Sequence, residues 1–186
     1  MYRVKIVPVT STIEENFALL SIDTLKKKIN PLTKAILICK SDTPIGYLYT
    51  EEELRQFKEF VIQHYLFLRE EEVYQEFAYD DAKYYSVLKI EGLEKHLLII
   101  DLISKRYSMY GDWMGCITSK NQELISCILK FVQVRLRSLS LVQIATEVTV
   151  DTSNTCFKEV IREYTSRWNN LLEGLNQIND VQCNRS

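Results

Sequence analysis

Hydrophobic and polar residues recur along the chain with two periods, and these periods predict its elements. Alternating and β-branched residues predict strands at 2–9, 34–39, 45–50, 84–90, 96–104 and 141–150. Apolar residues spaced three and four apart predict helices at about 12–28, 51–72, 118–136 and 151–172. Thr50 and Glu53 match a capping box, which predicts where the second helix begins. The predicted order is β-α-ββ-α-ββ-α-β-α.

This order predicts an α/β fold of mixed α+β character. We expect one central mixed sheet, mostly antiparallel, with helices on both faces. Hairpins are expected at 34–50 and 84–104, whereas the strand–helix–strand unit at 97–150 would add a parallel pair. We expect a single domain over 1–186, with a helical insertion at 51–82 and a flexible tail over 175–186.

Composition narrows the class of protein. The chain has 186 residues, of which 46% are hydrophobic and 26% charged, as in soluble globular proteins. A net charge of −2 argues against a nucleic-acid binder. The apolar run at 97–103 is too short to span a bilayer, and the first residues do not resemble a secretory signal, so we expect a cytoplasmic protein without a membrane partner. The five cysteines include no C-x-x-C pair and there are two histidines, so no metal site is expected.

The loop at 105–115 is the most irregular stretch and precedes a predicted helix. Gly111 and Gly115 would allow a phosphate to approach the backbone, and Lys105 and Arg106 would add positive charge. Asp112 in the same loop would repel an anion. Because many strand-to-helix loops contain two glycines and bind nothing, both a phosphate site and a plain connection stay open.

Several stretches together resemble one known family. They are the opening at 2–10, the predicted hairpin that contains Gly46 and Tyr47, the apolar run at 98–104, and Asn154 at the start of the last helix. In this order they resemble the GNAT superfamily of acetyl-coenzyme A-dependent N-acyltransferases. The stretch 108–113 stands in the register of that family's pyrophosphate loop.

The resemblance implies an acetyl group moved from acetyl-CoA to an amine of a small molecule, an amino sugar or a peptide. Acetyl-CoA would be the cofactor, and the residues implied to bind it are Ile103, Ser104, Tyr110, Gly111, Trp113 and Gly115. Glu147 would act as the base and Tyr164 as the acid. Tyr164 also shares a helical face with apolar residues, so a core position is its other interpretation.

The alternative is a catalytically inactive α/β interaction protein of the adaptor, inhibitor or immunity type. Tyrosines cluster in the acidic stretch 70–85 and in the loop 105–115. Aromatic rings with polar tips are frequent in protein interfaces as well as in ligand sites. A homodimer or another protein partner therefore stays open.

Overall fold

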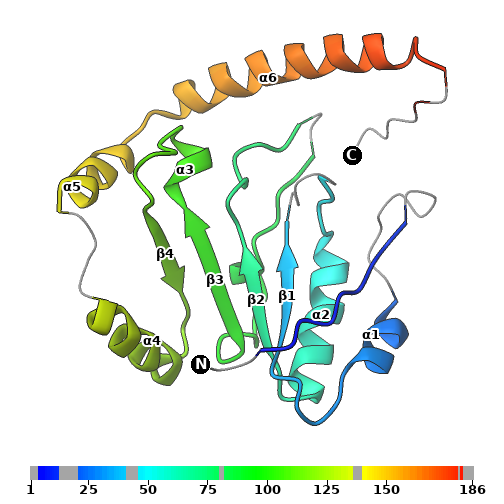
Figure 1. Cartoon of the computed structure of the whole chain (residues 1–186), viewed down its shortest axis with the longest axis vertical. Helices are drawn as coiled ribbons and strands as arrows, with labels where there is room; N and C mark the ends of the chain where they lie inside the picture. The colour runs from blue at the N-terminus through cyan, green and yellow to red at the C-terminus, as the bar shows by residue number, and fades with distance from the viewer. Residues whose placement is uncertain are drawn as a thin grey trace.

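A four-stranded sheet lies at the centre of the protein. The structure is a computed structural model that describes residues 4–12, 21–40, 46–79, 82–135, 140–179 and 181. The strands lie side by side in the order β1-β2-β3-β4 (Figure 1). Their bounds are Ala35–Cys39 for β1, Phe67–Glu71 for β2, Leu97–Leu102 for β3 and Gly115–Thr118 for β4.

The strand directions correct the expected sheet. β1 pairs with β2 and β2 with β3 in parallel, and only β4 runs antiparallel to its neighbour β3. An α/β fold with one mixed sheet is confirmed, but "mostly antiparallel" is wrong. The parallel pairs arise because the chain returns to the starting end of the sheet through α2 and then through the segment 72–96, so no hairpin joins these strands.

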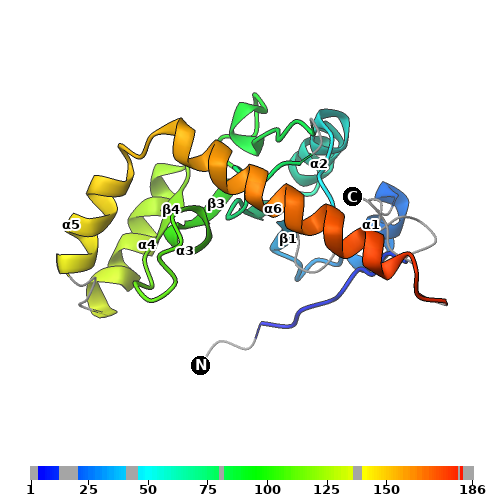
Figure 2. The same ribbon diagram turned by 90° about the horizontal axis from the view of Figure 1, so that it is seen from above.

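The helices are distributed around this sheet. Their bounds are Ile22–Lys28 for α1, Glu51–Gln63 for α2, Ile103–Arg106 for α3, Gln122–Arg135 for α4, Ser140–Thr149 for α5 and Asn154–Leu175 for α6, with a 3₁₀ turn η1 at Val87–Lys89. Both views show the long helix α6 crossing the end of the sheet (Figures 1 and 2). Two aromatic contacts join α6 to that end. The ring centroids of Phe77 and Tyr164 lie 6.2 Å apart, and those of Tyr107 and Phe157 lie 5.7 Å apart. Within the described ranges, no helix combines the length and the apolar character that crossing a bilayer requires.

The core lies between α2 and one face of the sheet. α2 begins as its sequence predicts, because Thr50 Oγ1 accepts from Glu53 N at 3.2 Å while the Glu53 carboxylate accepts from Thr50 N at 2.7 Å. Its buried face packs against alternate, inward-pointing strand residues. The central members of this core are Leu54, Phe57, Phe60, Val61, Ile38, Leu68, Leu97 and Ile99. On the opposite sheet face Leu37 and Phe67 are exposed.

The expected helix at 51–72 is divided, and its second part is strand β2. α2 ends at Gln63 because Tyr65 adopts a left-handed φ of 53°. Leu66 N then donates to Val61 O at 2.9 Å and Tyr65 N to Ile62 O at 3.2 Å, which is a Schellman motif. The helix end could not be predicted from the sequence, because a tyrosine occupies the left-handed position that glycine usually holds. The range 51–82, expected as a helical insertion, therefore contributes an inner strand of the sheet.

Four other expected strands are wrong in the described residues. Residues 4–9 and 46–50 form no strand, 84–90 contains the turn η1, and 141–150 lies almost wholly in α5. In α5 the valines and isoleucine are spaced two and four apart, which suits either period, and the main chain adopts the helix. Thr146 Oγ1 donates to Val142 O at 2.7 Å, one helical turn back. Predicted residues 2–3, 13–20 and 45 lie outside the described residues.

Candidate functional site

Polar side chains gather where the three parallel strands end. Lys40 follows β1, Glu70 and Glu71 end β2, and Asp101 lies near the end of β3, which leads into α3 with Lys105. Because β1, β2 and β3 are parallel, these ends lie at one edge of the sheet, here called the carboxyl edge. Ligands of open α/β sheets bind preferentially at such an edge.

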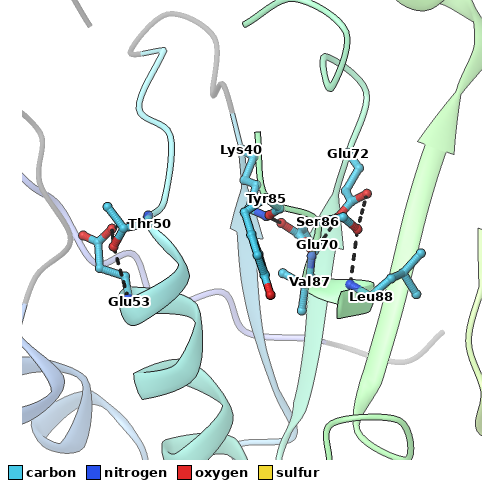
Figure 3. A network of polar contacts seen from close by, with 9 residues as sticks. All are labelled: Lys40, Thr50, Glu53, Glu70, Glu72, Tyr85, Ser86, Val87 and Leu88. Atoms are coloured by element: carbon cyan, nitrogen blue, oxygen red, sulfur yellow. Dashed lines mark hydrogen bonds and ion pairs between the residues drawn. The ribbon is translucent and has the colours of Figure 1, made fainter. Parts of the chain in front are cut away.

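The first feature of the carboxyl edge is a buried ion pair. Lys40 Nζ lies 2.8 Å from Glu70 Oε1, and the two side chains are 1% and 0% exposed. The same ammonium donates to the carbonyl of Tyr85 (Figure 3). It also lies 4.8 Å from the ring centroid of Tyr84. The Lys40 ammonium is therefore surrounded by a carboxyl group, a carbonyl oxygen and an aromatic ring, all of which stabilise a cation.

A second buried carboxylate lies beside this pair. Glu72 Oε1 accepts from Ser86 Oγ at 2.8 Å and from Val87 N at 3.2 Å (Figure 3). It thereby joins the end of β2 to the start of η1. Two carboxyl groups therefore lie next to one ammonium in this buried cluster, and the proximity of Glu72 makes it harder to ionise Glu70.

Burial sets the protonation of the cluster. It raises the pKa of Glu70 to about 8, against the opposing attraction of Lys40 and with the help of the Glu72 charge. Burial likewise raises the pKa of Tyr84, and the carboxylates of Glu72 and Glu70 add to this rise. Burial also raises the pKa of Asp101, although the guanidinium of Arg106 opposes the shift.

The third feature is an arginine held between two carboxylates. Arg106 ends α3, and its Nε donates to Glu76 Oε2 at 2.8 Å while its Nη1 lies 2.8 Å from Asp101 Oδ2. The three side chains are 15%, 20% and 21% exposed. Nη2 is buried and has no hydrogen-bond partner among the described residues.

Lys105 precedes this arginine and differs from Lys40 in exposure. Its side chain is exposed, and its Nζ lies 5.5 Å from the ring centroid of Tyr110. Within the described part of the chain it forms no ion pair. The carboxyl edge therefore contains one lysine buried in an ion pair and one with an accessible amine.

The structure brings together only some of the residues implied to bind acetyl-CoA. Ile103 and Ser104 belong to the single turn α3, and Ile103 N donates to Met114 O at 3.2 Å, next to Gly115. Gly115 opens β4 and pairs with Leu102. The other three, Tyr110, Gly111 and Trp113, are exposed residues of the connecting loop, and Trp113 has a φ of 52°.

The two residues expected as base and acid lie on different helices. Glu147 lies in α5, where a strand had been expected, and Tyr164 lies in α6. The Tyr164 ring packs edge-on against Phe77 and is 44% exposed. No hydrogen bond joins the two side chains, both of which belong to the described residues.

The sequence did not indicate the buried cluster of Lys40, Glu70 and Glu72. It also did not indicate the contacts of Arg106 with Glu76 and Asp101, here called the Arg106 clamp. The stretch 70–76 is acidic, which is typical of a solvated connection, yet Glu70 and Glu72 are among the most buried residues. No local signal was available, because the strand that ends in Glu70 and Glu71 was expected to be the end of a helix. Only the pairing of β1 with β2 brings Lys40 to Glu70.

The fold and this edge define an α/β protein with a polar site at the ends of parallel strands. The family model for class I and II aminotransferases matches residues 1–186. The chain therefore belongs to the class I and II aminotransferase family.

Relatives and solved structures agree with this family. The aromatic-amino-acid aminotransferase 2 of Thermococcus litoralis is 28% identical over 170 residues, which are 90% of this chain and 43% of that protein. The aspartate aminotransferase of Pyrococcus abyssi is 32% identical over 120 residues, 64% of this chain and 31% of that protein. The solved aromatic aminotransferase of Pyrococcus horikoshii superposes with a TM-score of 0.81 at 26% identity, covering 90% of this chain and 45% of that one. This chain thus spans less than half the length of the relatives it matches.

These findings correct the functional expectations. The GNAT resemblance is wrong, and with it acetyl transfer from acetyl-CoA, because the match to aminotransferases covers the whole chain. An inactive interaction protein is not supported either. Membership of the aminotransferase family implies pyridoxal phosphate as the cofactor instead of acetyl-CoA.

The carboxyl edge has residues of the types that pyridoxal phosphate requires. This cofactor binds covalently to a lysine amine and places a charged partner, often an aspartate, against its ring nitrogen. Lys105 offers an accessible amine, and Glu71 and Asp101 are half-buried carboxylates nearby in the sheet. The buried Nη2 of Arg106 is a hydrogen-bond donor without an acceptor in the described residues, as expected beside an anionic ligand.

Proposed function

We propose that the chain forms part of a pyridoxal phosphate-dependent aminotransferase that moves an amino group between an amino acid and a keto acid. The observation that carries the proposal is the family match over residues 1–186. The exposed lysine at the carboxyl edge of the parallel strands supports it, because the family's chemistry needs an accessible amine at a ligand site.

Lys105 is the lysine that we assign to the cofactor. Lys40 lies at the same edge, but its amine is buried, paired with Glu70 and bonded to the Tyr85 carbonyl. Releasing it would leave the Glu70 carboxylate buried without its cation, which is strongly unfavourable. Lys105 is free of such a contact within the described residues and lies one helical turn beyond the end of β3.

Glu71 is the carboxylate that we assign to the ring nitrogen. Among the described residues 70–76 and 97–102, the other carboxyl groups are engaged: Glu70 with Lys40, Glu72 with Ser86, and Asp101 and Glu76 with Arg106. Glu71 is half-buried, ends β2 beside Ile100 of β3, and accepts no hydrogen bond from a described residue. An ionised carboxylate in this place would hold a proton on the ring nitrogen.

When bound, pyridoxal phosphate supplies the electron sink that stabilises negative charge on the substrate carbon. Lys105 would hold the cofactor through its side-chain amine, and the same amine would be the group that moves a proton at the substrate carbon. The Glu71 carboxylate maintains the protonated ring nitrogen. The neighbouring Arg106 holds α3 in place through Asp101 and Glu76.

The relatives' names guide the choice of substrates for the test. They are aromatic-amino-acid and aspartate aminotransferases, so aspartate and tyrosine with 2-oxoglutarate are the first pairs to assay. A protein partner is also part of the proposal, because apolar side chains such as Phe131, Leu141 and Val148 are exposed on α4 and α5. Light scattering after size-exclusion chromatography measures whether a second copy binds.

Covalent trapping tests the proposal directly. The protein is mixed with pyridoxal phosphate, reduced with borohydride, digested and analysed by mass spectrometry. We expect the phosphopyridoxyl group on Lys105, its loss in Lys105→Ala, and no loss in Lys58→Ala, which removes a lysine of α2. Failure to label Lys105 in the intact protein, or equal labelling of many lysines, would refute the assignment.

A further inference from the structure

Arg106 directly follows the lysine assigned to the cofactor and is the best-anchored side chain of α3. Its guanidinium contacts Glu76 on one side and Asp101 on the other, both at 2.8 Å. We propose that Arg106 is a positioning residue that fixes the single turn α3, and thereby the Lys105 amine, between β3 and the segment that follows β2. The inference rests on the proposed role of Lys105.

The turn α3 needs such an anchor because it cannot hold its own shape. It has four residues, Ile103–Arg106, and its N-cap Leu102 forms no side-chain capping bond. The backbone hydrogen bond from Tyr107 N to Ile103 O, at 3.0 Å, closes its C-terminal end. Isolated helical segments of this length are not stable in water, so contacts from elsewhere in the fold must define the direction of its side chains.

The carboxylates that hold Arg106 are themselves fixed. Asp101 Oδ1 accepts from Leu102 N at 2.8 Å, which ties that carboxylate to the backbone of β3. Glu76 Oε1 accepts from Gln75 Nε2 at 2.8 Å. Arg106 therefore bridges two carboxylates that each have a further hydrogen bond, and not two fully exposed side chains. Charge-assisted hydrogen bonds of this kind, partly shielded from water, are stronger than exposed pairs.

Arginine is the residue that this arrangement requires. Its planar guanidinium carries five donors that point in fixed directions, so it can bind Glu76 through Nε and Asp101 through Nη1 at once. A lysine at this position would keep the charge but offer a single ammonium to two separated carboxylates. A methionine would leave both carboxylates without a counter-ion.

Loss of the clamp would redirect Lys105. Without the guanidinium, Asp101 and Glu76 would be half-buried negative groups, and Lys105 is the lysine nearest in sequence to Asp101. The Lys105 ammonium would be drawn towards them and away from the accessible position beside Tyr110. The clamp thus keeps the amine accessible as well as ordered.

The test compares Arg106→Met and Arg106→Lys with Arg55→Met, which breaks an exposed ion pair to Glu51 on α2. The first readout needs no cofactor: acetic anhydride at limiting concentration labels the amines of the intact protein, and mass spectrometry gives the labelling of Lys105 relative to exposed Lys120. We expect this ratio to fall at least threefold in Arg106→Met, to fall less in Arg106→Lys, and to stay unchanged in Arg55→Met. An unchanged ratio in a folded Arg106→Met protein would overturn the proposal.

A second readout separates the clamp from the proposed function. Titration with pyridoxal phosphate, followed by its absorbance band, should show at least tenfold weaker binding in Arg106→Met and a pH dependence of the band that differs from wild type. Glu76→Gln/Arg106→Met should recover part of the Lys105 labelling, because it removes one uncompensated carboxylate. If wild type binds no pyridoxal phosphate, the proposed function fails, and the labelling ratio still decides the clamp. If Arg106→Met does not fold, Arg106→Lys and Glu76→Gln decide it.

Discussion

Lys40 Nζ lies 2.8 Å from Glu70 Oε1 at the ends of neighbouring parallel strands, and both side chains are almost completely buried. Desolvating two charges costs several kcal/mol each, and their mutual attraction offsets this only when both are present. The pair therefore makes each partner dependent on the other. It also lies beside Glu72 and Tyr84, so its charge state affects the whole carboxyl edge.

Removing one partner of this pair should be far worse than removing both. At pH 9, where Glu70 is ionised in wild type, we expect Lys40→Met to lower the free energy of unfolding by about 3–5 kcal/mol, because the buried Glu70 carboxylate loses its counter-ion. Lys40→Met/Glu70→Leu should recover most of that loss. Urea denaturation measures both variants. Lys26→Met, which breaks the exposed pair with Asp23, should change stability by less than about 1 kcal/mol. A double variant as unstable as Lys40→Met would contradict this account.

The raised pKa of Glu70 predicts a pH dependence of stability. The folded-state pKa is about 8 and the ordinary value is 4.5, so the folded protein keeps this proton over a range in which the unfolded chain has lost it. The resulting contribution is fully present below pH 4.5 and is lost as pH rises through 8. We expect stability to fall across this window in wild type.

Glu70→Gln isolates this effect, because glutamine has the same shape and does not titrate. Its free energy of unfolding should fall less between pH 5 and 8.5 than that of wild type, measured by denaturant titration at each pH. The pKa of Asp101 is also raised and contributes with the same sign in both proteins. Parallel curves for the two proteins would show that Glu70 titrates normally.

The capping box at the start of α2 should contribute measurably to stability. Thr50→Ala removes the acceptor for Glu53 N, and we expect a loss of about 1 kcal/mol in the free energy of unfolding. Thr50→Ser keeps a hydroxyl and should lose only a few tenths of that value. Thermal unfolding followed by circular dichroism compares the three proteins. Equal melting temperatures for the alanine and serine variants would argue against the cap.

The two loop glycines should respond differently to alanine. A Cβ at Gly115 would lie 2.5 Å from Leu102 Cδ2 and 2.8 Å from the backbone oxygen of Asp101. The backbone contact cannot be relieved by a side-chain rotation, so we expect Gly115→Ala to destabilise the protein by about 1–3 kcal/mol. A Cβ at Gly111 meets nothing within 4 Å, and Gly111→Ala should be close to neutral. Melting temperatures check both, and a neutral Gly115→Ala would show that β3 and β4 separate easily.

Elements with local signals were predictable from the sequence. The capping box at Thr50 marks the start of α2, the apolar run 35–39 marks β1, and the helical spacing after Asn154 marks α6. Each depends on neighbours within a few residues, so a sequence contains the whole signal. Strand β2 was missed because Tyr65 stops α2 without a glycine, and because β2 ends in two glutamates, followed by a third, which together resemble a solvated helix end.

The candidate site was less predictable because its contacts are non-local. The loop 105–115 was expected to lead into a helix, but it begins within α3 and leads into strand β4. Phosphate binding by its glycines stays a prediction. The structure instead gives Gly115 a packing reason in the pairing of β4 with β3. The composition of the stretch 70–76 is typical of a solvated connection, whereas Glu70 and Glu72, at the end of the inner strand β2, are buried.

The sequence alone determined the start and the buried face of α2 and the α/β class, because hydrophobic periodicity and capping act over one or two turns. Only the tertiary structure decided that β1, β2 and β3 are parallel, since strand pairing joins segments that are far apart in the chain. That pairing brings Lys40 to Glu70, and the packing of the segment after β2 brings Glu76 to Arg106. The buried Lys40 and the partly buried Arg106 are stabilised by these acidic partners. The partners lie about 30 residues away in the sequence, so no local sequence pattern identifies them.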